Sequence, residues 1–128
     1  MKKVKIIFAL LIILSLLIMS CACIANDRYY LRVDESWVLT TEKPTDGDYY
    51  AFNSKDIDKV IEKIVIKETA KQMYIYNIKE SSARLICTEQ PQFLRYEVRY
   101  YSVTINSSTY NVGVHIDTNK TIVLIDVE

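Results

Sequence analysis

Cys87 and His115 are the residues whose side chains could work together as a nucleophile and a general base. A thiol becomes a strong nucleophile when an adjacent imidazole accepts its proton. The two residues lie on different predicted strands, however, and no sequence signature of a cysteine enzyme surrounds them. His115 is also the single histidine of the chain, so neither a histidine-rich metal site nor a relay of two histidines can be built. We therefore expect no catalytic residue, no metal site and no enzymatic activity, and a Cys/His-dependent enzyme ranks last among three candidate functions.

The glycine content argues against two further classes of enzyme. The chain contains only Gly47 and Gly113, whereas loops that cradle nucleotide phosphates and turns that expose a nucleophile need several glycines. Asp46 and Asp48 flank Gly47, but the further oxygen ligands and the closing glutamate of a calcium loop are missing. Asp-Gly at this point indicates a tight turn. The sequence thus predicts no cofactor.

Residues 1–25 have the composition of a targeting segment. Three lysines open the chain, at Lys2, Lys3 and Lys5, and residues 6–25 then carry no charge. A basic start followed by an apolar stretch and small residues is typical of a secretory signal, and it also suits a membrane anchor. Because a chain of 128 residues has room for one domain, we divide it into this segment and a single extracytoplasmic domain at residues 26–128.

The end of this segment carries a lipidation motif. Ile18-Met19-Ser20-Cys21 resembles the lipobox of bacterial lipoproteins, in which a peptidase cuts before a cysteine whose thiol receives a lipid. The resemblance implies a lipid on Cys21, with Cys23 as the alternative position. Met19 departs from the pattern, since a smaller or β-branched residue is usual there. On this interpretation the domain is anchored to a membrane of the bacterial cell envelope.

The sequence of this segment is also compatible with two alternatives to lipidation. Cleavage after Ala22 or Ala25 would release a secreted or periplasmic domain without an anchor. An uncleaved helix over residues 6–25 would span the membrane, because this length at about 1.5 Å per residue covers the roughly 30 Å hydrocarbon core. All three alternatives place residues 26–128 outside the cytoplasm.

Charge and cysteine content restrict the possible partners. Residues 26–128 contain 13 of the 16 basic residues and all 16 acidic residues, a formal charge of −3, so they lack the basic excess of a nucleic-acid-binding domain. We expect the membrane and an unidentified protein or envelope component as partners, and no nucleic acid. Cys87 is expected to be a small buried residue of a strand. The three cysteines, Cys21, Cys23 and Cys87, do not form a disulfide framework.

One helix is predicted in the N-terminal half of the domain. Ser54 is expected to cap it, and Asp56 and Asp58 lie in its first turn, where the helix dipole favours negative charge. Apolar residues then recur at helical spacing and form one face: Ile57, Val60, Ile61, Ile64 and Val65. Lysines on the opposite side are interleaved with acidic residues and indicate a solvated face. Glu68 falls on the apolar side, so the predicted helix ends near Lys67.

β-branched and aromatic residues predict strands on both sides of this helix. The predicted strands are residues 29–33, 37–41 and 48–52 before it, and 73–78, 83–88, 93–105, 110–117 and 121–127 after it. Their short polar connections favour antiparallel neighbours, because parallel strands need a crossover of a dozen or more residues. The predicted fold is α+β: one N-terminal-half helix packed on an antiparallel β-meander, preceded by a signal or anchor helix.

Three details of these strands are also predicted. Residues 110–117 alternate between apolar and polar side chains, which gives one core face and one wet face. Residues 122–125 are apolar on both faces, so their strand is expected to be central or covered. Within residues 93–105, one face of the predicted strand changes from polar to apolar along its length. A bulge near Tyr100 or Tyr101 would explain this change.

Tyrosine is the conspicuous excess, and all ten tyrosines lie after residue 25. Most are expected to fill sheet positions, where aromatic residues are favoured. Three pairs are adjacent in the sequence, Tyr29-Tyr30, Tyr49-Tyr50 and Tyr100-Tyr101. Neighbours on a strand point to opposite faces, so one member of each pair should meet solvent or a partner. The candidate interaction surface consists of Tyr29, Tyr49, Tyr101 and His115.

Part of the C-terminal half resembles a known module. Tyr96-Glu97-Val98, followed by residues 110–117 and by Thr118-Asn119-Lys120-Thr121-Ile122-Val123-Leu124, is similar to the closing hairpin of PepSY-type domains, with Asn119 where the family usually has glycine. The resemblance implies a small envelope module linked to peptidase inhibition or interaction. We therefore expect an exported, lipid-anchored binding module of the cell envelope. The alternative is a secreted, unanchored inhibitor-like or assembly protein.

Overall fold

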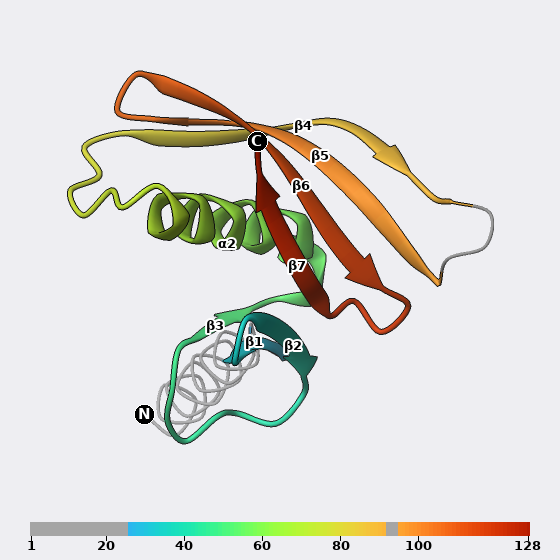
Figure 1. Cartoon of the computed structure of the whole chain (residues 1–128). Coiled ribbons are helices and arrows are strands. Elements are labelled where there is room, and N and C mark those ends of the chain that lie inside the picture. The colour runs from blue at the N-terminus through green and yellow to red at the C-terminus, as the bar shows by residue number, and fades with distance from the viewer. Residues whose placement is uncertain (1–25, 92–94) are drawn as a thin grey trace, which may run out of the picture.

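The computed structural model describes residues 26–91 and 95–128. These residues form seven strands, one α-helix and one short 3-10 helix. The strands are β1 (Arg28–Val33), β2 (Ser36–Thr40), β3 (Tyr49–Phe52), β4 (Ser81–Glu89), β5 (Tyr96–Ile105), β6 (Ser108–Asp117) and β7 (Ile122–Val127). The 3-10 helix η1 (Ser54–Asp56) leads directly into the α-helix α2 (Ile57–Gln72). Figure 1 shows α2 lying along one face of the strands β4 to β7.

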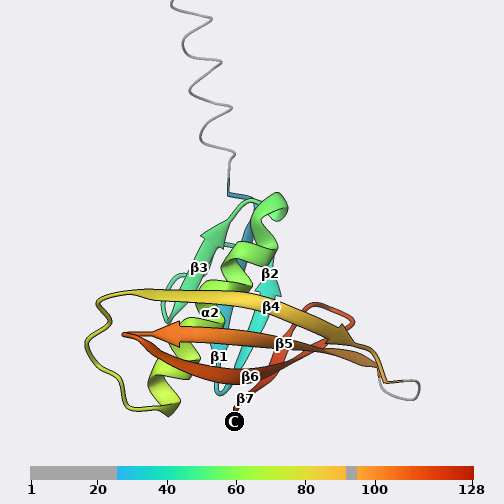
Figure 2. The ribbon, with the colours of Figure 1, turned by 90° about the horizontal axis from the view of Figure 1, so that it is seen from above.

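All described strands belong to one antiparallel sheet, with the order β3-β1-β2-β7-β6-β5-β4. Strands β4 to β7 form a meander, and the pair Trp37↔Ile122 joins β2 to β7. In Figure 2, β1, β2 and β3 run across the direction of β4 to β6, so the sheet curls around α2. The predicted α+β fold, with one helix on an antiparallel meander, is confirmed in these residues. The predicted signal or anchor helix falls in residues 1–25 and lies outside the described residues.

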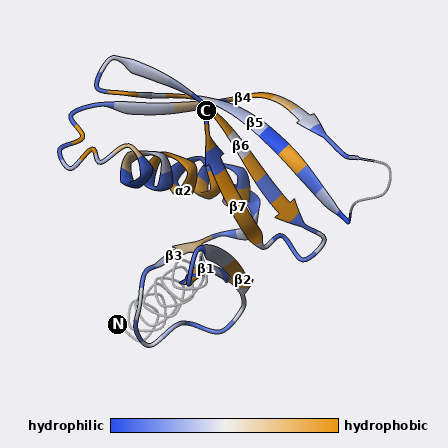
Figure 3. Cartoon of the chain, viewed as in Figure 1, coloured by the Kyte–Doolittle hydropathy of each residue, from blue (hydrophilic) through white to orange (hydrophobic). Residues whose placement is uncertain are grey.

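The core is formed by apolar residues that alternate with polar ones along the strands and by apolar residues that recur at helical spacing in α2. Val114 and Ile116 on β6 are fully buried, as the alternating pattern of residues 110–117 predicts. Ile61, Ile64 and Val65 of α2 are also fully buried and belong to the same cluster. Figure 3 shows hydrophobic and hydrophilic residues following one another along β5 and β6. Burial of each large apolar side chain stabilises the fold by roughly 1.5–3 kcal/mol, which fixes α2 in the hollow of the sheet.

The start of the helical segment differs from the prediction. Asn53, not Ser54, caps η1, because Asn53 Oδ1 accepts a hydrogen bond from the Lys55 N–H at 3.0 Å. The N–H and the hydroxyl of Ser54 instead donate to the two carboxylate oxygens of Asp27, at 2.9 and 3.1 Å. The hydrogen bond from the Ser54 backbone holds the pKa of Asp27 below its ordinary value. Asp27 thereby fastens the chain before β1 to the beginning of the helical segment.

The end of the helix also differs from the prediction. Helix α2 continues past Lys67 to Gln72, because Glu68 finds polar partners on the apolar side, as described below. The helix is closed by a turn in which Tyr74 has a φ of 55° and the Ile75 N–H donates to the Ala70 carbonyl at 2.8 Å.

Residues 73–78 are not a strand, contrary to the prediction. The segment that follows α2 is held by Asn106, which lies in the turn between β5 and β6. Asn106 Oδ1 accepts a hydrogen bond from the Lys79 N–H at 2.7 Å, and Asn106 Nδ2 donates to the Asn77 carbonyl at 2.6 Å. These contacts satisfy backbone groups that a strand would have paired with a neighbour, so the apolar and aromatic residues of the segment did not produce a strand.

The positions of β3 and β7 in the sheet agree only in part with the sequence-based expectations. Strand β3 pairs with β1 rather than with β2, so the turn at Gly47 does not close a simple hairpin. Gly47 does adopt a positive φ of 84°. Strand β7 takes the middle place in the sheet order, as expected, but its residue Leu124 is 48% exposed.

The bulge expected at Tyr100 or Tyr101 lies in the strand opposite them. The register of β4 shifts between Leu85 and Cys87, which face Tyr101 and Tyr100. Cys87 is exposed, and the prediction that it is buried is wrong. It lies on β4, the last strand in the sheet order, whose side chains are mostly open to solvent.

Across the two described ranges, no helix is long and apolar enough to cross a membrane.

Candidate functional site

A groove with a volume of 1290 Å³ lies along α2. Its walls come from α2, from the segment after it, and from parts of β1, β3 and β7 that the curl of the sheet brings toward the helix. We call it the α2 groove, and its defining residues are Arg32, Tyr50, Lys67, Glu68, Tyr76 and Leu124. Aromatic, aliphatic and charged side chains therefore meet in one concave surface, as is usual for binding sites.

Glu68 is the charged residue deepest in this groove. Only 8% of the residue is exposed, and its Oε1 accepts a hydrogen bond from the Trp37 indole N–H at 3.1 Å. Arg32 Nε lies 3.2 Å from the same oxygen. A carboxylate in such a place is destabilising unless it is paired and hydrogen-bonded. Trp37 and Arg32 supply both, which explains why α2 continues through this position.

The guanidinium of Arg32 is only partly used by Glu68. The Nε–Oε1 separation is that of an ion pair, but the N–H is not aligned with the oxygen, and Arg32 Nε has no hydrogen-bond partner within residues 26–91 and 95–128. The Arg32 side chain is 21% exposed and lines the groove. A guanidinium carries five N–H donors in a planar fork, so Arg32 can donate to a carboxylate or carbonyl that enters the groove.

Lys67, which lines the groove, lies over two aromatic rings. Its Nζ is 5.5 Å from the centroid of the Trp37 ring and 5.6 Å from that of Tyr50, and the two rings are themselves 5.5 Å apart. Asp48 Oδ1 is 3.6 Å from the same ammonium group. Cation–π attraction and the ion pair together hold the charged end of Lys67 at the rim of the groove.

Tyr50 contributes a neutral hydroxyl to the groove. Burial raises the pKa of Tyr50, and the negative charges of Asp48 and Glu68 raise it further. The phenol therefore stays protonated well beyond neutral pH and can donate a hydrogen bond to a ligand.

The charges around the groove are balanced. Four basic residues line it, Arg32, Lys63, Lys67 and Lys71, together with four acidic residues, Glu35, Asp48, Glu68 and Asp126. Such a surface does not select a strongly charged ligand. It suits an extended peptide, whose backbone offers hydrogen-bonding groups and whose side chains can pack on tyrosine and isoleucine.

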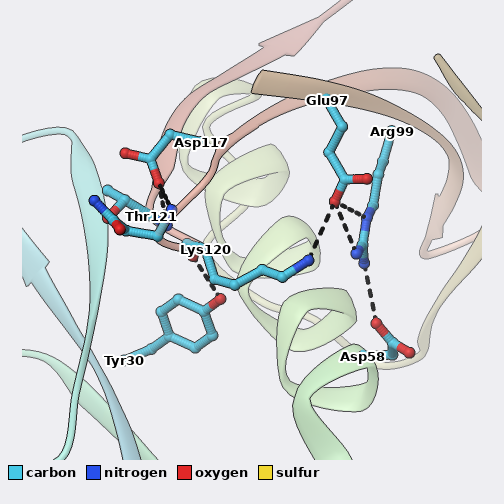
Figure 4. Close-up of polar contacts among 8 residues, drawn as sticks. Tyr30, Asp58, Glu97, Arg99, Asp117, Lys120 and Thr121 are labelled. Carbon is cyan, nitrogen blue, oxygen red and sulfur yellow. Dashed lines mark hydrogen bonds and ion pairs between the residues drawn. The ribbon is translucent and has the colours of Figure 1, made fainter. Parts of the chain in front are cut away.

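A second polar cluster ties α2 to the sheet, and Figure 4 shows its contacts. Arg99 Nη1 lies 3.0 Å from Asp58 Oδ1, and Arg99 Nη2 lies 3.0 Å from Glu97 Oε1. Lys120 Nζ approaches the same Glu97 oxygen at 3.8 Å, and the Lys120 carbonyl accepts a hydrogen bond from the Tyr30 hydroxyl at 2.7 Å. Its two cations and two anions satisfy one another, so the cluster has the character of a structural clamp.

The titration behaviour of this clamp agrees with that role. Burial disfavours the charged form of Arg99, but hydrogen bonds with Tyr101 and Asp58 and the charge of Glu97 outweigh it, so the pKa of Arg99 is raised. Burial also raises the pKa of Tyr30 and of Tyr101. All three groups keep their ordinary protonation state at neutral pH, and none is poised to exchange a proton.

Comparisons with protein-family models, curated proteins and solved structures gave no match. The function proposed below therefore rests on the sequence and on the geometry of the groove.

The four residues predicted to form an interaction surface do not all lie together. Tyr29 and Tyr49 meet edge to face at 6.3 Å on the outer side of β1 and β3. Tyr101 is only 2% exposed and cannot belong to an exposed surface, whereas its neighbour Tyr100 is 36% exposed. His115 is half-buried against Tyr96, with ring centroids 5.4 Å apart.

Of the three cysteines, only Cys87 falls within the described residues. Strand β5 lies between the strands that carry Cys87 and His115, so the two side chains are not adjacent. Cys21 and Cys23, the predicted lipidation positions, lie outside the described residues.

Sequence reasoning missed the α2 groove but contained one signal of it. In the sequence, Glu68 falls on the apolar side of the predicted helix, where a charged residue needs a partner. The partner Trp37 is 31 residues away in the chain, and only the curl of the sheet brings the two together.

Proposed function

We propose that the protein is a small exported domain of the cell envelope that binds an extended peptide segment of a partner protein in the α2 groove. Arg32 carries the proposal, because Glu68 holds its guanidinium from one side while the side chain, 21% exposed, lines an open groove. Such a donor gains most when a carbonyl or carboxylate of a ligand reaches it. The mixed rim of tyrosine, lysine and acidic residues supports a peptide over a nucleotide or a metal ion.

The exported location is supported by the sequence of residues 1–25 alone. The lysines, the apolar stretch and the partial lipobox favour a lipid on Cys21 or, as the alternative, on Cys23. The resemblance to PepSY-type domains fits a small envelope module linked to peptidase inhibition or interaction. A secreted form without an anchor would use the same groove.

A random peptide library displayed on phage and selected against the full chain in detergent tests the binding proposal. We expect enrichment of related extended sequences, and we expect Lys71→Ala and Tyr76→Ala to weaken a selected peptide at least about fivefold, because an interface side chain typically contributes on the order of 1 kcal/mol. Both residues are exposed and line the groove, so these changes leave the core intact.

Lys59→Ala is the matched control for Lys71→Ala. Lys59 is also an exposed lysine of α2, with 80% of its side chain accessible, but it does not line the groove. A selection without enrichment, or peptides that bind the Lys71→Ala and Tyr76→Ala variants as tightly as the parent chain, would refute the proposal.

A further inference from the structure

Strand β4 is an exposed end of the sheet. It has nine residues and pairs only with β5 among the described strands. Leu85 is 44% exposed, Ile86 is 55% exposed, and Cys87 next to them is exposed as well. An end strand with apolar side chains and no proline offers unpaired N–H and C=O groups to another strand.

The bulge in β4 arranges its charged residues in an unusual way. Arg84 pairs with Ser102, and Glu89 pairs with Val98. Ser102 and Val98 are an even number of residues apart on β5, so their side chains share one face of the sheet. Arg84 and Glu89 therefore also share that face, although five positions on a regular strand would place them on opposite faces. The extra residue at the register shift between Leu85 and Cys87 makes the difference.

The position of Glu89 is fixed by a further contact. Glu89 Oε2 accepts a hydrogen bond from the Tyr100 hydroxyl at 3.3 Å. Tyr100 faces the same side as Val98, two residues before it on β5. The strand thus presents a cation near its beginning and an anion near its end, with an apolar centre of Leu85, Ile86 and Cys87 between them.

We propose that β4 pairs antiparallel with β4 of a second copy of this chain, about a two-fold axis between Ile86 and Cys87. In this register, Arg84 of each copy lies opposite Glu89 of the other, and Ile86 lies opposite Cys87. The surface is complementary to itself, as an interface with two-fold symmetry requires. Opposite charges directly across two strands stabilise their pairing, and the symmetry provides this pair twice. The seven-stranded sheets of the two copies then form one continuous sheet across the dimer.

The other end of the sheet is less suited to this role. Strand β3 has four residues, and the chain passes from it directly into η1 and α2. Short end strands are one of the ways in which proteins avoid edge-to-edge association. The proposal is independent of the α2 groove, because none of Arg84, Glu89 or Cys87 lines it.

Thiol cross-linking tests the proposed register directly. Strand geometry places the Cα atoms of the two Cys87 residues about 6 Å apart across the axis, so a short bismaleimide should join two copies of the full chain in detergent. Cys87→Ser should abolish the cross-linked dimer. A dimer that forms equally in Cys87→Ser would arise from other cysteines and would contradict this register, as would the absence of any cross-linked product.

Charge reversal provides the second test, by sedimentation at about 100 μM chain. The parent chain should be a dimer. Arg84→Glu and Glu89→Arg should each weaken it about tenfold or more, because each change creates two like-charge pairs, and the double variant should regain dimerisation. Glu42→Arg, a charge reversal at an exposed position outside β4, should leave the dimer unchanged. A monomeric parent chain, or a double variant no better than the single ones, overturns the proposal.

Discussion

Glu68 links three elements through one carboxylate. Its Oε1 receives the Trp37 indole N–H and lies beside Arg32 Nε, so α2, β2 and β1 meet at this atom. In a poorly solvated place the attraction between Arg32 and Glu68 is offset by the loss of their hydration, and the net contribution of the intact pair is small. Removal of one partner, in contrast, destabilises the folded protein, because the other charge is then left without compensation.

Replacement of Glu68 by glutamine should therefore lower the free energy of unfolding by about 2–4 kcal/mol. Glutamine keeps the shape and an acceptor for Trp37 but removes the negative charge that balances Arg32. Urea unfolding followed by the fluorescence of Trp37, the single tryptophan, measures the change. Glu42→Gln, at an exposed position, should change the value by less than about 0.5 kcal/mol, and an equally small effect of Glu68→Gln would show that the pair is not important for stability.

At the scale of elements, Asn106 joins the segment after α2 to the hairpin of β5 and β6. It has a φ of 48°, and its side chain holds both Asn77 and Lys79. Asparagine suits this position because it tolerates the left-handed conformation and can bind the backbone with its amide. The segment that it holds also carries Tyr76, which lines the α2 groove.

Two substitutions at Asn106 separate the contribution of its backbone conformation to stability from that of its side-chain amide. Asn106→Gly retains the φ but loses the amide, and we expect it to lower the free energy of unfolding by about 1–2 kcal/mol. Asn106→Ala should cost about 1 kcal/mol more, because a Cβ disfavours a positive φ. Hydrogen exchange in residues 73–80 should accelerate in both variants. Unchanged exchange there would mean that Asn106 does not hold the segment.

Local patterns predicted some elements and failed at others for one physical reason. The alternation of residues 110–117 and the spacing of Ile57, Ile61 and Ile64 depend on which side of one element faces the core, and both predictions were right. The helix end near Lys67, the strand at residues 73–78 and the burial of Cys87 depend on partners far away in the chain. Trp37 and Arg32 extend the helix, Asn106 replaces strand pairing, and the place of β4 in the sheet exposes Cys87.

The same distinction applies to the candidate site. Glu68 was visible as a charge on an apolar helix face, so a site of interest could be suspected there. The contribution of Arg32 could not be seen, since an arginine on a strand is ordinary until the sheet curls. The sequence shows that one residue of the Tyr100-Tyr101 pair must face outward, but adjacency alone does not indicate that it is Tyr100 rather than Tyr101.

For the whole molecule, the mature N-terminus is the most informative measurement. We expect the mass of the protein purified from a bacterial membrane fraction to correspond to a chain that begins at Cys21 and carries a diacylglycerol, because residues 18–21 resemble a lipobox. Cys21→Ala should remove the lipid and release the domain from the membrane fraction. A mass that begins at Asn26, or one that retains Met1, would instead support cleavage without lipidation or an uncleaved anchor.

The contact between Asp27 and Ser54 determines which end of the domain a tether would hold. Asp27 is fixed at the beginning of the helical segment, whereas Tyr74 and Tyr76 follow the end of α2. The 16 residues of α2 span about 24 Å at 1.5 Å each, and Figure 2 shows the start of β1 beside one end of this helix and the segment after α2 beside the other. In a domain held at a surface through the chain before Asp27, the length of α2 would thus separate the end of the groove that contains Tyr74 and Tyr76 from that surface. The tyrosine end of the groove would face away from the membrane, where a partner in the surrounding envelope could reach it.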